Sequence, residues 1–334
     1  MPRVAIVPGD GIGPEVVGAA RYVLDATGVD LDWVEGEAGE DAAAASGAPL
    51  PPETLRLVTD VGVVLKGPMA NPIGKGYESP NIGLRAAADL YANVRIAQSF
   101  EGAPTPFPGL NVVVVREITE DIYNGARQMV GPDAAIGIKF VTRAASERIA
   151  RFAFEYAMSQ GRTKVTITHK AATLKQTDGL FLEAARSVAG DYPSIECDDY
   201  LIDALTMMLV RRPQQFDVIL ASFQYGDILA DLCAGLAGGL GLVPGASFGD
   251  RAAFFEAAHG SAPKHAGQDK VNPTALILSG ALLLDHIGET DAASRVRRAT
   301  EAVIAEGRVT TYDLGGSATT TAMAEAIAKK LEVN

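Results

Sequence analysis

The chain has 334 residues, of which 48% are hydrophobic and 21% charged, values that are ordinary for a globular enzyme of one large or two smaller domains. The formal net charge of -12 argues against general nucleic-acid binding, which needs a basic surface, but not against an anionic substrate held by local arginines. Two cysteines, the lack of a signal-peptide layout and the lack of a bilayer-length apolar run predict a cytoplasmic protein without a membrane segment.

Short apolar runs alternate with longer amphipathic stretches, which is the pattern of an α/β fold. Strands are predicted at Val4–Val7, Val61–Leu65, Val112–Val115, Val165–Thr168 and Phe216–Ala221. Helices are predicted from about Pro14 to Leu24 and at Arg85–Leu90, Ala144–Ser159 and Thr173–Val188. Polar residues follow the strand ends, where open α/β sheets usually carry their sites.

The glycine-rich segment Pro8–Pro14 follows the first strand and opens a helix. A dinucleotide-binding GxGxxG motif would need a glycine at position 14, where this chain has proline. Proline is natural in the first turn of a helix. The segment therefore predicts a tight turn before a helix and not a Rossmann fingerprint.

Asp227 and Asp231 are four residues apart in a segment that follows the last predicted strand. In a helix this spacing places both carboxylates on one face, where they repel each other unless a cation lies between them. Mg²⁺ and Mn²⁺ favour such oxygen ligands. For the spacing alone, a solvated helix face with two unrelated acids is the commoner explanation.

Five segments, in this order and spacing, carry a specific family pattern: Pro8–Glu15, Asp89–Arg95, Val115–Glu117, Gly226–Asp231 and His259–Pro263. They resemble the metal-dependent β-decarboxylating dehydrogenases, the isocitrate and isopropylmalate dehydrogenase family, from residue 8 to about residue 320. The resemblance implies a two-domain α/β fold that is not a Rossmann fold. It implies a large nucleotide-binding domain of residues 1–98 plus 246–334, and a small domain, 99–245, with the dimer interface and metal ligands. A homodimer with shared active sites is expected.

The resemblance implies a reaction in which a 2-hydroxy acid is oxidised at C2 and the neighbouring carboxylate leaves as CO₂. Mg²⁺ or Mn²⁺ would lower the pKa of the hydroxyl and stabilise the enolate. Asp227 and Asp231 match the family's metal ligands, and Asp203 matches the ligand supplied across the dimer. Apart from the resemblance, Asp203 reads as an ordinary aspartate at the start of a helix.

The resemblance also assigns the residues that bind and protonate the substrate. Three arginines match the substrate-binding arginines: Arg85, Arg95 and Arg116. Lys170 matches the lysine that assists removal of the hydroxyl proton, and Tyr123 the tyrosine that protonates the enolate. Taken singly, each arginine is equally well explained by a salt bridge, although a buried unpaired guanidinium such as that expected for Arg116 is costly.

Ser79 and Asn81 lie six and four residues before Arg85, as in the isocitrate branch, where both contact the γ-carboxylate. Isopropylmalate enzymes have apolar residues there, so a substrate with a terminal anion is predicted. Ala172 and Phe223 stand where the isocitrate pattern has asparagine, and Lys75 adds a positive charge. These departures leave open an isocitrate analogue (homoisocitrate or a phosphonate), and 3-isopropylmalate is a further alternative.

Adenosine recognition is expected at one loop and at two later positions: His259, Gly260, Ser261, Ala262, Pro263, Lys264, His265, Asn272 and Tyr312. Lys264 and Tyr312 match the NADP pattern of the family, whereas Gly316 stands where an arginine is expected. NADP is predicted over NAD. Two other classes stay open: a non-catalytic regulatory subunit of a hetero-oligomeric dehydrogenase, and a plain anion-binding protein.

Overall fold

The structure is a computed structural model that describes residues 1–72, 74 and 76–331. The chain forms two compact units. Unit 1 consists of Met1–Leu90, Gln98–Pro108 and Ala237–Asn334, and unit 2 of Tyr91–Ala97 and Gly109–Leu236. Both contain strands and helices, so the predicted α/β class is confirmed. The predicted domain boundaries at 98/99 and 245/246 stay a prediction.

Unit 1 contains strands in the order β2-β1-β3-β12-β11. Their bounds are β1 Arg3–Val7, β2 Asp32–Glu35, β3 Val63–Lys66, β11 Pro244–Gly249 and β12 Ala253–Ala257. Neighbouring strands run parallel except for β11 and β12, which are antiparallel. The predicted adenosine loop, residues 259–263, follows the end of β12.

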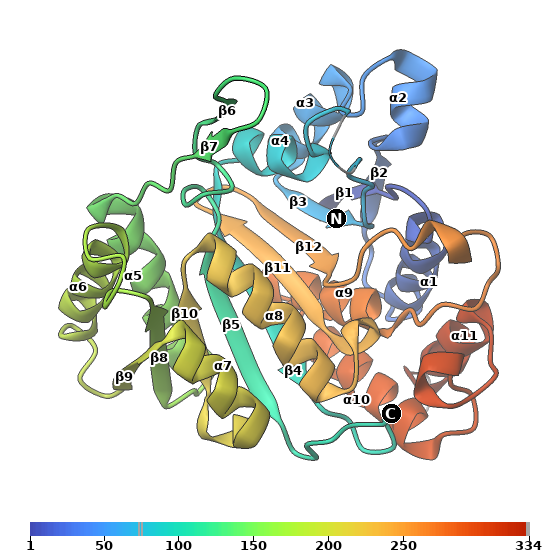
Figure 1. Ribbon diagram of the computed structural model, residues 1–334. Coiled ribbons are helices and arrows are strands. Elements are labelled where there is room, and N and C mark those ends of the chain that lie inside the picture. The colour runs from blue at the N-terminus through green and yellow to red at the C-terminus, as the bar shows by residue number, and fades with distance from the viewer. Residues whose placement is uncertain (73, 75, 332–334) are drawn as a thin grey trace. The chain divides into compact units, whose positions relative to one another are not determined.

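Seven helices are described in unit 1: α1 Gly13–Asp25, α2 Glu40–Ser46, α3 Pro52–Val61, α4 Pro80–Ala87, α9 Thr274–His286, α10 Thr290–Glu306 and α11 Thr320–Leu331. Short 3₁₀ turns lie at Leu240–Leu242, Pro263–His265 and Tyr312–Leu314. Helix α9 is buried along almost its whole length because α1, α10, β11 and β12 pack around it (Figure 1). Its apolar side chains belong to the core of this unit.

Unit 2 contains strands in the order β4-β5-β10-β8-β9. Their bounds are β4 Leu90–Gln98, β5 Asn111–Glu117, β8 Lys164–His169, β9 Glu196–Leu201 and β10 Val218–Ala221. The helices are α5 Arg143–Ser159, α6 Thr177–Ala189, α7 Ile202–Arg211 and α8 Phe223–Ala237, with a 3₁₀ turn at Pro213–Gln215. Strand β10 lies between β5 and β8 and is parallel to both, so the residues that follow β5, β8 and β10 meet at one edge.

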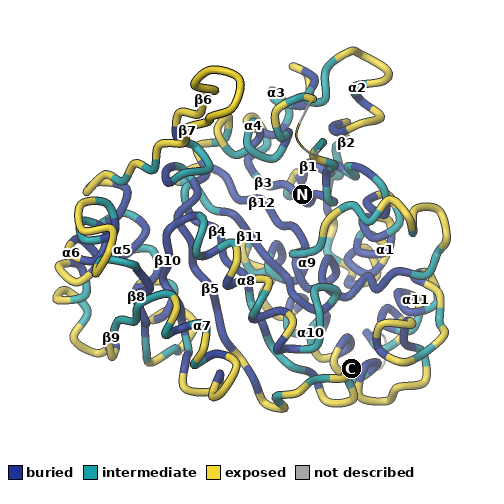
Figure 2. Tube along the Cα trace, in the orientation of Figure 1, coloured by how far each residue is buried: buried dark blue, intermediate teal, exposed yellow. Residues whose placement is uncertain are grey.

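A two-stranded hairpin, β6 Arg127–Met129 and β7 Ala135–Gly137, belongs to unit 2 but lies outside the sheet. Figure 2 shows that it is exposed along both strands, whereas β5 and β10 are buried. No helix in the described part of the chain is long and apolar enough to cross a membrane.

Several predicted element boundaries are wrong, each for a local reason. The predicted helix Arg85–Leu90 ends at Ala87, because Asp89 adopts a left-handed φ of 49° and β4 begins at Leu90. Val61 belongs to α3 and not to the following strand, and Gly62 ends that helix with a φ of 74°. The helix predicted from Thr173 begins at Thr177, after a turn closed on the carbonyl oxygen of Lys170.

Candidate active site

Asp227 and Asp231 lie on α8, as their spacing predicts. Partial burial raises the pKa of Asp231, and the negative charge of Asp227 raises it further, while Arg95 and Arg116 lower it. The two carboxylates therefore repel each other, and a bound cation would relieve that repulsion. In the described residues no three His, Cys, Asp or Glu side chains gather into a metal site. The described part of one chain thus offers two carboxylate ligands of the kind that Mg²⁺ or Mn²⁺ binds. Two ligands do not complete a metal site.

Arg116 is buried at the end of β5, only 4% exposed, and its charge is compensated. Its Nε donates to Asn93 Oδ1 on β4 at 3.0 Å, and its Nη1 donates to Asp227 Oδ1. Its guanidinium carbon also lies 5.5 Å from the ring centroid of Phe223. Arg95, on β4, is likewise buried, and its charge reaches Asp231. Two predicted substrate arginines therefore lie close to the predicted metal ligands.

Gly226 allows α8 to approach β5 this closely, because a Cβ at that position would lie 2.4 Å from Arg116 Cβ. We expect Gly226→Ala to lower the free energy of unfolding by about 1–3 kcal/mol through overpacking, and to lower activity as α8 shifts. Gly235→Ala, on the same helix, is the matched control because an added Cβ there meets nothing within 4 Å. Urea denaturation should show this control unchanged or stabilised by up to about 1 kcal/mol. Equal effects of the two substitutions would contradict the close-approach argument.

Tyr123 lies in the loop that follows β5, with its ring packed edge-on against Phe223 at a centroid distance of 5.0 Å. Burial raises its pKa, and the charge of Asp227 and a hydrogen bond to it act in the same direction. The phenol therefore keeps its proton near neutral pH and can act as a proton donor. Phe223, which departs from the isocitrate pattern, packs against both Tyr123 and Arg116.

Lys170 directly follows β8, and its Nζ donates to Asp203 Oδ1 on α7 at 2.6 Å. This bond lowers the pKa of Asp203, whose side chain is 65% exposed. His169 is buried, and its Nε2 forms a hydrogen bond with Asp199 Oδ1 at 3.0 Å. Its Nδ1 accepts a hydrogen bond from the amide N–H of Ala171, so its contacts are those of a structural residue. Lys170 and Asp203 therefore form a pair of their own, and Asp203 does not join Asp227 and Asp231 in a metal cluster.

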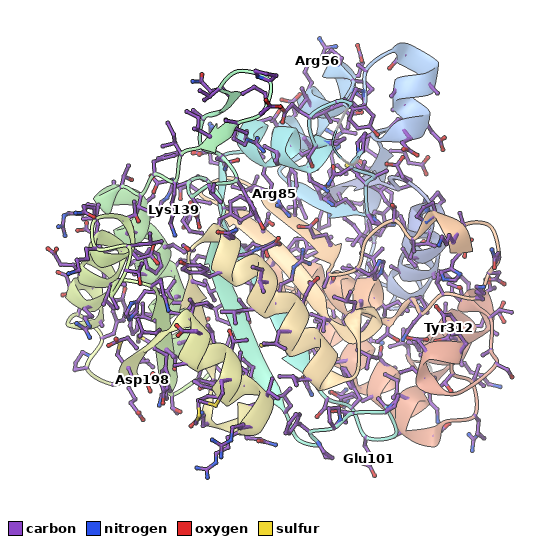
Figure 3. The ribbon with its side chains drawn as sticks, viewed as in Figure 1. Arg56, Arg85, Glu101, Lys139, Asp198 and Tyr312 are labelled. Atoms are coloured by element: carbon purple, nitrogen blue, oxygen red, sulfur yellow. The ribbon has the colours of Figure 1, made fainter. Side chains whose placement is uncertain are left out.

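Ser79, Asn81 and Arg85 belong to the start and the last turn of α4 in unit 1. Arg85 is labelled in Figure 3. Its Nη2 donates to the buried Glu256 at 2.8 Å, and Lys66 pairs with the other oxygen of this carboxylate at 2.6 Å. Arg85 Nε and Asn81 Oδ1 are buried without a hydrogen-bond partner in the described structure. Such atoms are rare unless a ligand satisfies them, which fits a polar substrate group at this helix. Lys75, the predicted extra positive charge, lies outside the described residues.

The predicted adenosine loop, residues 259–263, follows β12 and packs on the glycine-rich turn after β1. Ile12 N donates to Ser261 O at 2.9 Å, and a Cβ on Gly11 would lie 2.0 Å from that oxygen. Gly11 has a left-handed φ of 62°. The glycines of this turn therefore serve close backbone approach, in agreement with the prediction of a tight turn.

The other predicted nucleotide residues gather around the 3₁₀ turns at 263–265 and 312–314. The His265 and Tyr312 ring centroids lie 6.1 Å apart, and Asn272 donates to Asp313 at 2.9 Å. Lys264 and Tyr312 are exposed. Lys270 Nζ lies 5.9 Å from the Tyr312 ring, a second cation that the sequence interpretation missed although it stands two residues before Asn272. A Cβ at Gly316 would lie 2.0 Å from Thr310 O, so this backbone has no room for the arginine expected there.

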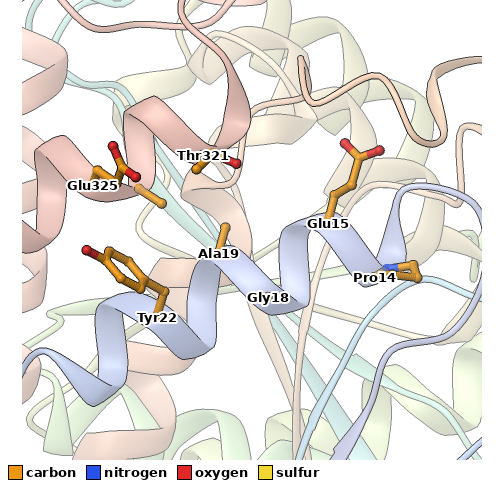
Figure 4. Close-up of a pocket in the computed structure, with 8 residues that line it drawn as sticks. Pro14, Glu15, Gly18, Ala19, Tyr22, Thr321 and Glu325 are labelled. Carbon is orange, nitrogen blue, oxygen red and sulfur yellow. The ribbon is translucent and has the colours of Figure 1, made fainter.

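The side chains that sequence reasoning missed in unit 2 are Asn93, Asp121, Lys139, Asp178 and Tyr225. Asn93 lies within the segment Asp89–Arg95 that the sequence singles out, and Asp121 stands two residues before Tyr123, whereas the other three carry no local signal. A cavity of about 340 Å³ between α1 and α11 contains none of the predicted site residues (Figure 4). It is lined by residues such as Glu15, Tyr22 and Glu325 and is separate from the chemistry described above.

Comparison with known proteins gives one consistent family. The family described as isocitrate/isopropylmalate dehydrogenase matches residues 3–327. A 3-isopropylmalate dehydrogenase of Methanothermobacter thermautotrophicus is 43% identical over 330 residues, with 99% of this chain and 98% of the relative covered. Catalytic subunit 5 of the mitochondrial NAD isocitrate dehydrogenase of Arabidopsis thaliana is 44% identical over 327 residues, with 98% and 87% covered.

The crystal structure of isocitrate dehydrogenase from Methylococcus capsulatus matches with a TM-score of 0.97 and 49% identity over 99% of both chains. Members of this family use a divalent metal ion and NAD or NADP. The fold, the match over nearly the whole chain and these identities agree. The chain therefore belongs to the isocitrate/isopropylmalate dehydrogenase family and is a decarboxylating dehydrogenase that acts on a CH–OH group.

Proposed function

We propose that this protein catalyses the NAD(P)-dependent oxidative decarboxylation of an isocitrate-like 2-hydroxy acid with Mg²⁺ or Mn²⁺. The observation that carries the proposal is the cluster around Asp227, in which one carboxylate bonds both a buried arginine and a phenol. An anion-binding group, a metal ligand and a proton donor thus share one centre next to Asp231. If α8 presented only a solvated face with two unrelated acids, its carboxylate would not be paired with a buried guanidinium.

The roles follow from the chemistry of each group. Asp227 and Asp231 would hold the metal ion, which when bound would lower the pKa of the substrate hydroxyl and stabilise negative charge after CO₂ leaves. Arg95 and Arg116 would bind the substrate's carboxylates, a task for which the planar guanidinium is well suited. Lys170 would take the hydroxyl proton, and Tyr123 would return a proton to the enolate carbon.

We infer that the active protein is a homodimer with shared sites. Lys170 and Asp203 pair with each other, away from the incomplete ligand set of Asp227 and Asp231. Helices α7 and α8 also expose large apolar side chains, with exposed fractions of 47% for Met207, 53% for Val210 and 57% for Ile228. A second copy seated on α7 and α8 would bury these side chains and supply Lys170 and Asp203 to the first.

The proposed substrate carries a terminal anion, because Arg85 Nε is a buried donor without a hydrogen-bond partner at α4 in the described structure, and an anionic oxygen would accept from it. Isocitrate fits this requirement, and so do homoisocitrate and a phosphonate analogue. One relative named above is a 3-isopropylmalate dehydrogenase, so an apolar terminal group is the alternative to be tested. NADP is proposed over NAD on account of Lys264 and of Lys270 beside Tyr312.

A substrate panel tests this function. With Mn²⁺ and either nucleotide, we expect kcat/KM to be at least about tenfold higher for isocitrate, homoisocitrate or a phosphonate analogue than for 3-isopropylmalate, since a polar site discriminates against a partner that leaves it unpaired. Nucleotide reduction is followed by the absorbance of the reduced nicotinamide. Ser79→Ala should raise KM for the best substrate. Preference for 3-isopropylmalate would contradict the proposed terminal anion, and no turnover with any acid would favour a regulatory or anion-binding role.

A further inference from the structure

A buried ion-pair network lies in unit 2 beside the proposed catalytic residues and contains none of them. Its centre is Lys139, two residues after β7 (Figure 3). The Lys139 side chain is 14% exposed. Lys139 Nζ lies 2.7 Å from Asp178 Oδ1 and 3.5 Å from Asp121 Oδ1. These contacts are ion pairs by distance, without the angles of aligned hydrogen bonds. Nζ also lies 4.6 Å from the centroid of the Tyr225 ring.

Each of the two aspartates that Lys139 joins holds a segment of the proposed site by its backbone. Asp178 Oδ2 accepts the amide N–H of Lys170 at 2.6 Å. Asp121 Oδ2 accepts the amide N–H of Gln224, in the first turn of α8, at 3.0 Å. Asp121 stands two residues before Tyr123 and has a left-handed φ of 70°. The network therefore joins the Lys170 segment, the Tyr123 segment and the start of α8.

The charge balance explains why this network depends on its lysine. Asp121 and Asp178 are 1% and 2% exposed, and buried carboxylates require a positive partner. The hydroxyl of Tyr225 donates a hydrogen bond to Asp178 as well, but it carries no charge that could replace that of Lys139. If Lys139 were removed, two buried negative charges would face each other without a cation, and the backbone amides they hold would shift.

We propose that Lys139 is a positioning residue that, through Asp178 and Asp121, holds the segments of Lys170 and Tyr123 in place, Lys170 for the partner's site and Tyr123 for the site of its own chain. This inference rests on the roles assigned to Lys170 and Tyr123 in the proposed function. Lys139 acts through other residues and touches neither proposed proton-transfer group. A displacement of about 1 Å in a catalytic group is enough to cost about 100-fold in rate.

The test is Lys139→Met in the full-length protein. We expect kcat to fall by about 10–100-fold. KM for the substrate and the dissociation constant for Mn²⁺ should change by less than about threefold, because the ligands and arginines are intact. The solvent deuterium isotope effect on kcat should rise, since proton transfer by misplaced groups becomes the slow step. A purely structural role would lower the amount of active protein without changing this isotope effect.

Lys164→Met is the matched control. Lys164 begins the same strand, β8, that ends next to Lys170, and it pairs with Asp198 at 2.7 Å and Glu196 at 3.0 Å. This control should keep kcat and the isotope effect within about twofold of the wild type, as expected for a partly exposed ion pair. If Lys139→Met fails to fold, Tyr225→Phe decides, because it removes only the hydroxyl that bonds Asp178. It should lower kcat several-fold with a larger isotope effect.

Lys170→Met, assayed in parallel, separates this inference from the proposed function. If Lys170→Met is inactive while folded Lys139→Met retains wild-type kcat and isotope effect, Lys139 is not a positioning residue. A Tyr225→Phe variant with wild-type values would overturn the inference in the same way. If Lys170→Met itself retains full activity, the proposed role of Lys170 fails instead.

Discussion

Asp227→Asn will abolish metal-dependent turnover while leaving the protein folded. The amide keeps the shape of the carboxylate and can still accept a hydrogen bond from Arg116, but it loses the negative charge that a divalent cation requires. We expect kcat with Mn²⁺ to fall by about 10³-fold or more, because metal polarisation supplies several kcal/mol of transition-state stabilisation. Nucleotide reduction and calorimetric Mn²⁺ titration measure the two effects separately. The side chain is 47% exposed, but it compensates the charge of the buried Arg116, so the free energy of unfolding should fall by about 1–3 kcal/mol.

Asp285→Asn is the control for this substitution. Asp285 is also a partly exposed aspartate, 35% exposed, and it bonds an arginine, Arg297. It lies in unit 1 and is not one of the proposed site residues. It should keep both turnover and Mn²⁺ affinity. Mn²⁺ binding and turnover that survive in Asp227→Asn would overturn the ligand assignment, whereas loss of both in Asp285→Asn would mean that the assay reports folding and not the site.

A dimer that combines one Lys170→Met chain with one Asp227→Asn chain will be active, although each variant alone is inactive. Lys170→Met should lower kcat by about 10²–10⁴-fold by removing the proposed proton acceptor, and Asp227→Asn should remove the proposed metal site. If each site takes Asp227 from one chain and Lys170 from the other, a hybrid dimer contains one intact site. Random reassociation makes half of the dimers hybrids, so a mixture should regain about one quarter of wild-type activity. The mixture is co-refolded, checked as a dimer by light scattering and assayed.

A second mixture tests the same geometry with the opposite expectation. Lys170 and Asp203 bond each other in one chain, so one chain would supply both of them to its partner's site. Mixing Lys170→Met with Asp203→Asn therefore leaves every site with one defect, and activity should stay low. If the Lys170→Met and Asp227→Asn mixture also stays inactive although hybrids form, the sites are built within single chains and the shared-site model is wrong.

The local features of this molecule follow from the sequence. The spacing of Asp227 and Asp231 predicts their common helix because 3.6 residues make one helical turn wherever the helix lies. The prolines and glycines of the turn after β1 predict a non-Rossmann connection, and the alternation of apolar runs predicts the α/β class that the structure confirms. The predicted helix boundaries are wrong where the conformation depends on a single residue. At Asp89, for example, a left-handed φ prevents the helix from continuing to Leu90.

The sequence by itself determined the elements, the family pattern and the type of chemistry, because periodicity and motif spacing are properties of neighbouring residues. Only the tertiary structure showed that Asp227, 111 residues after Arg116, bonds that buried guanidinium, and that Lys139 joins Asp121 to Asp178. These contacts arise when β10 pairs between β5 and β8 and brings three strand ends to one edge. Strand pairing over such distances is governed by the burial of whole strands and leaves no local mark on the residues that meet.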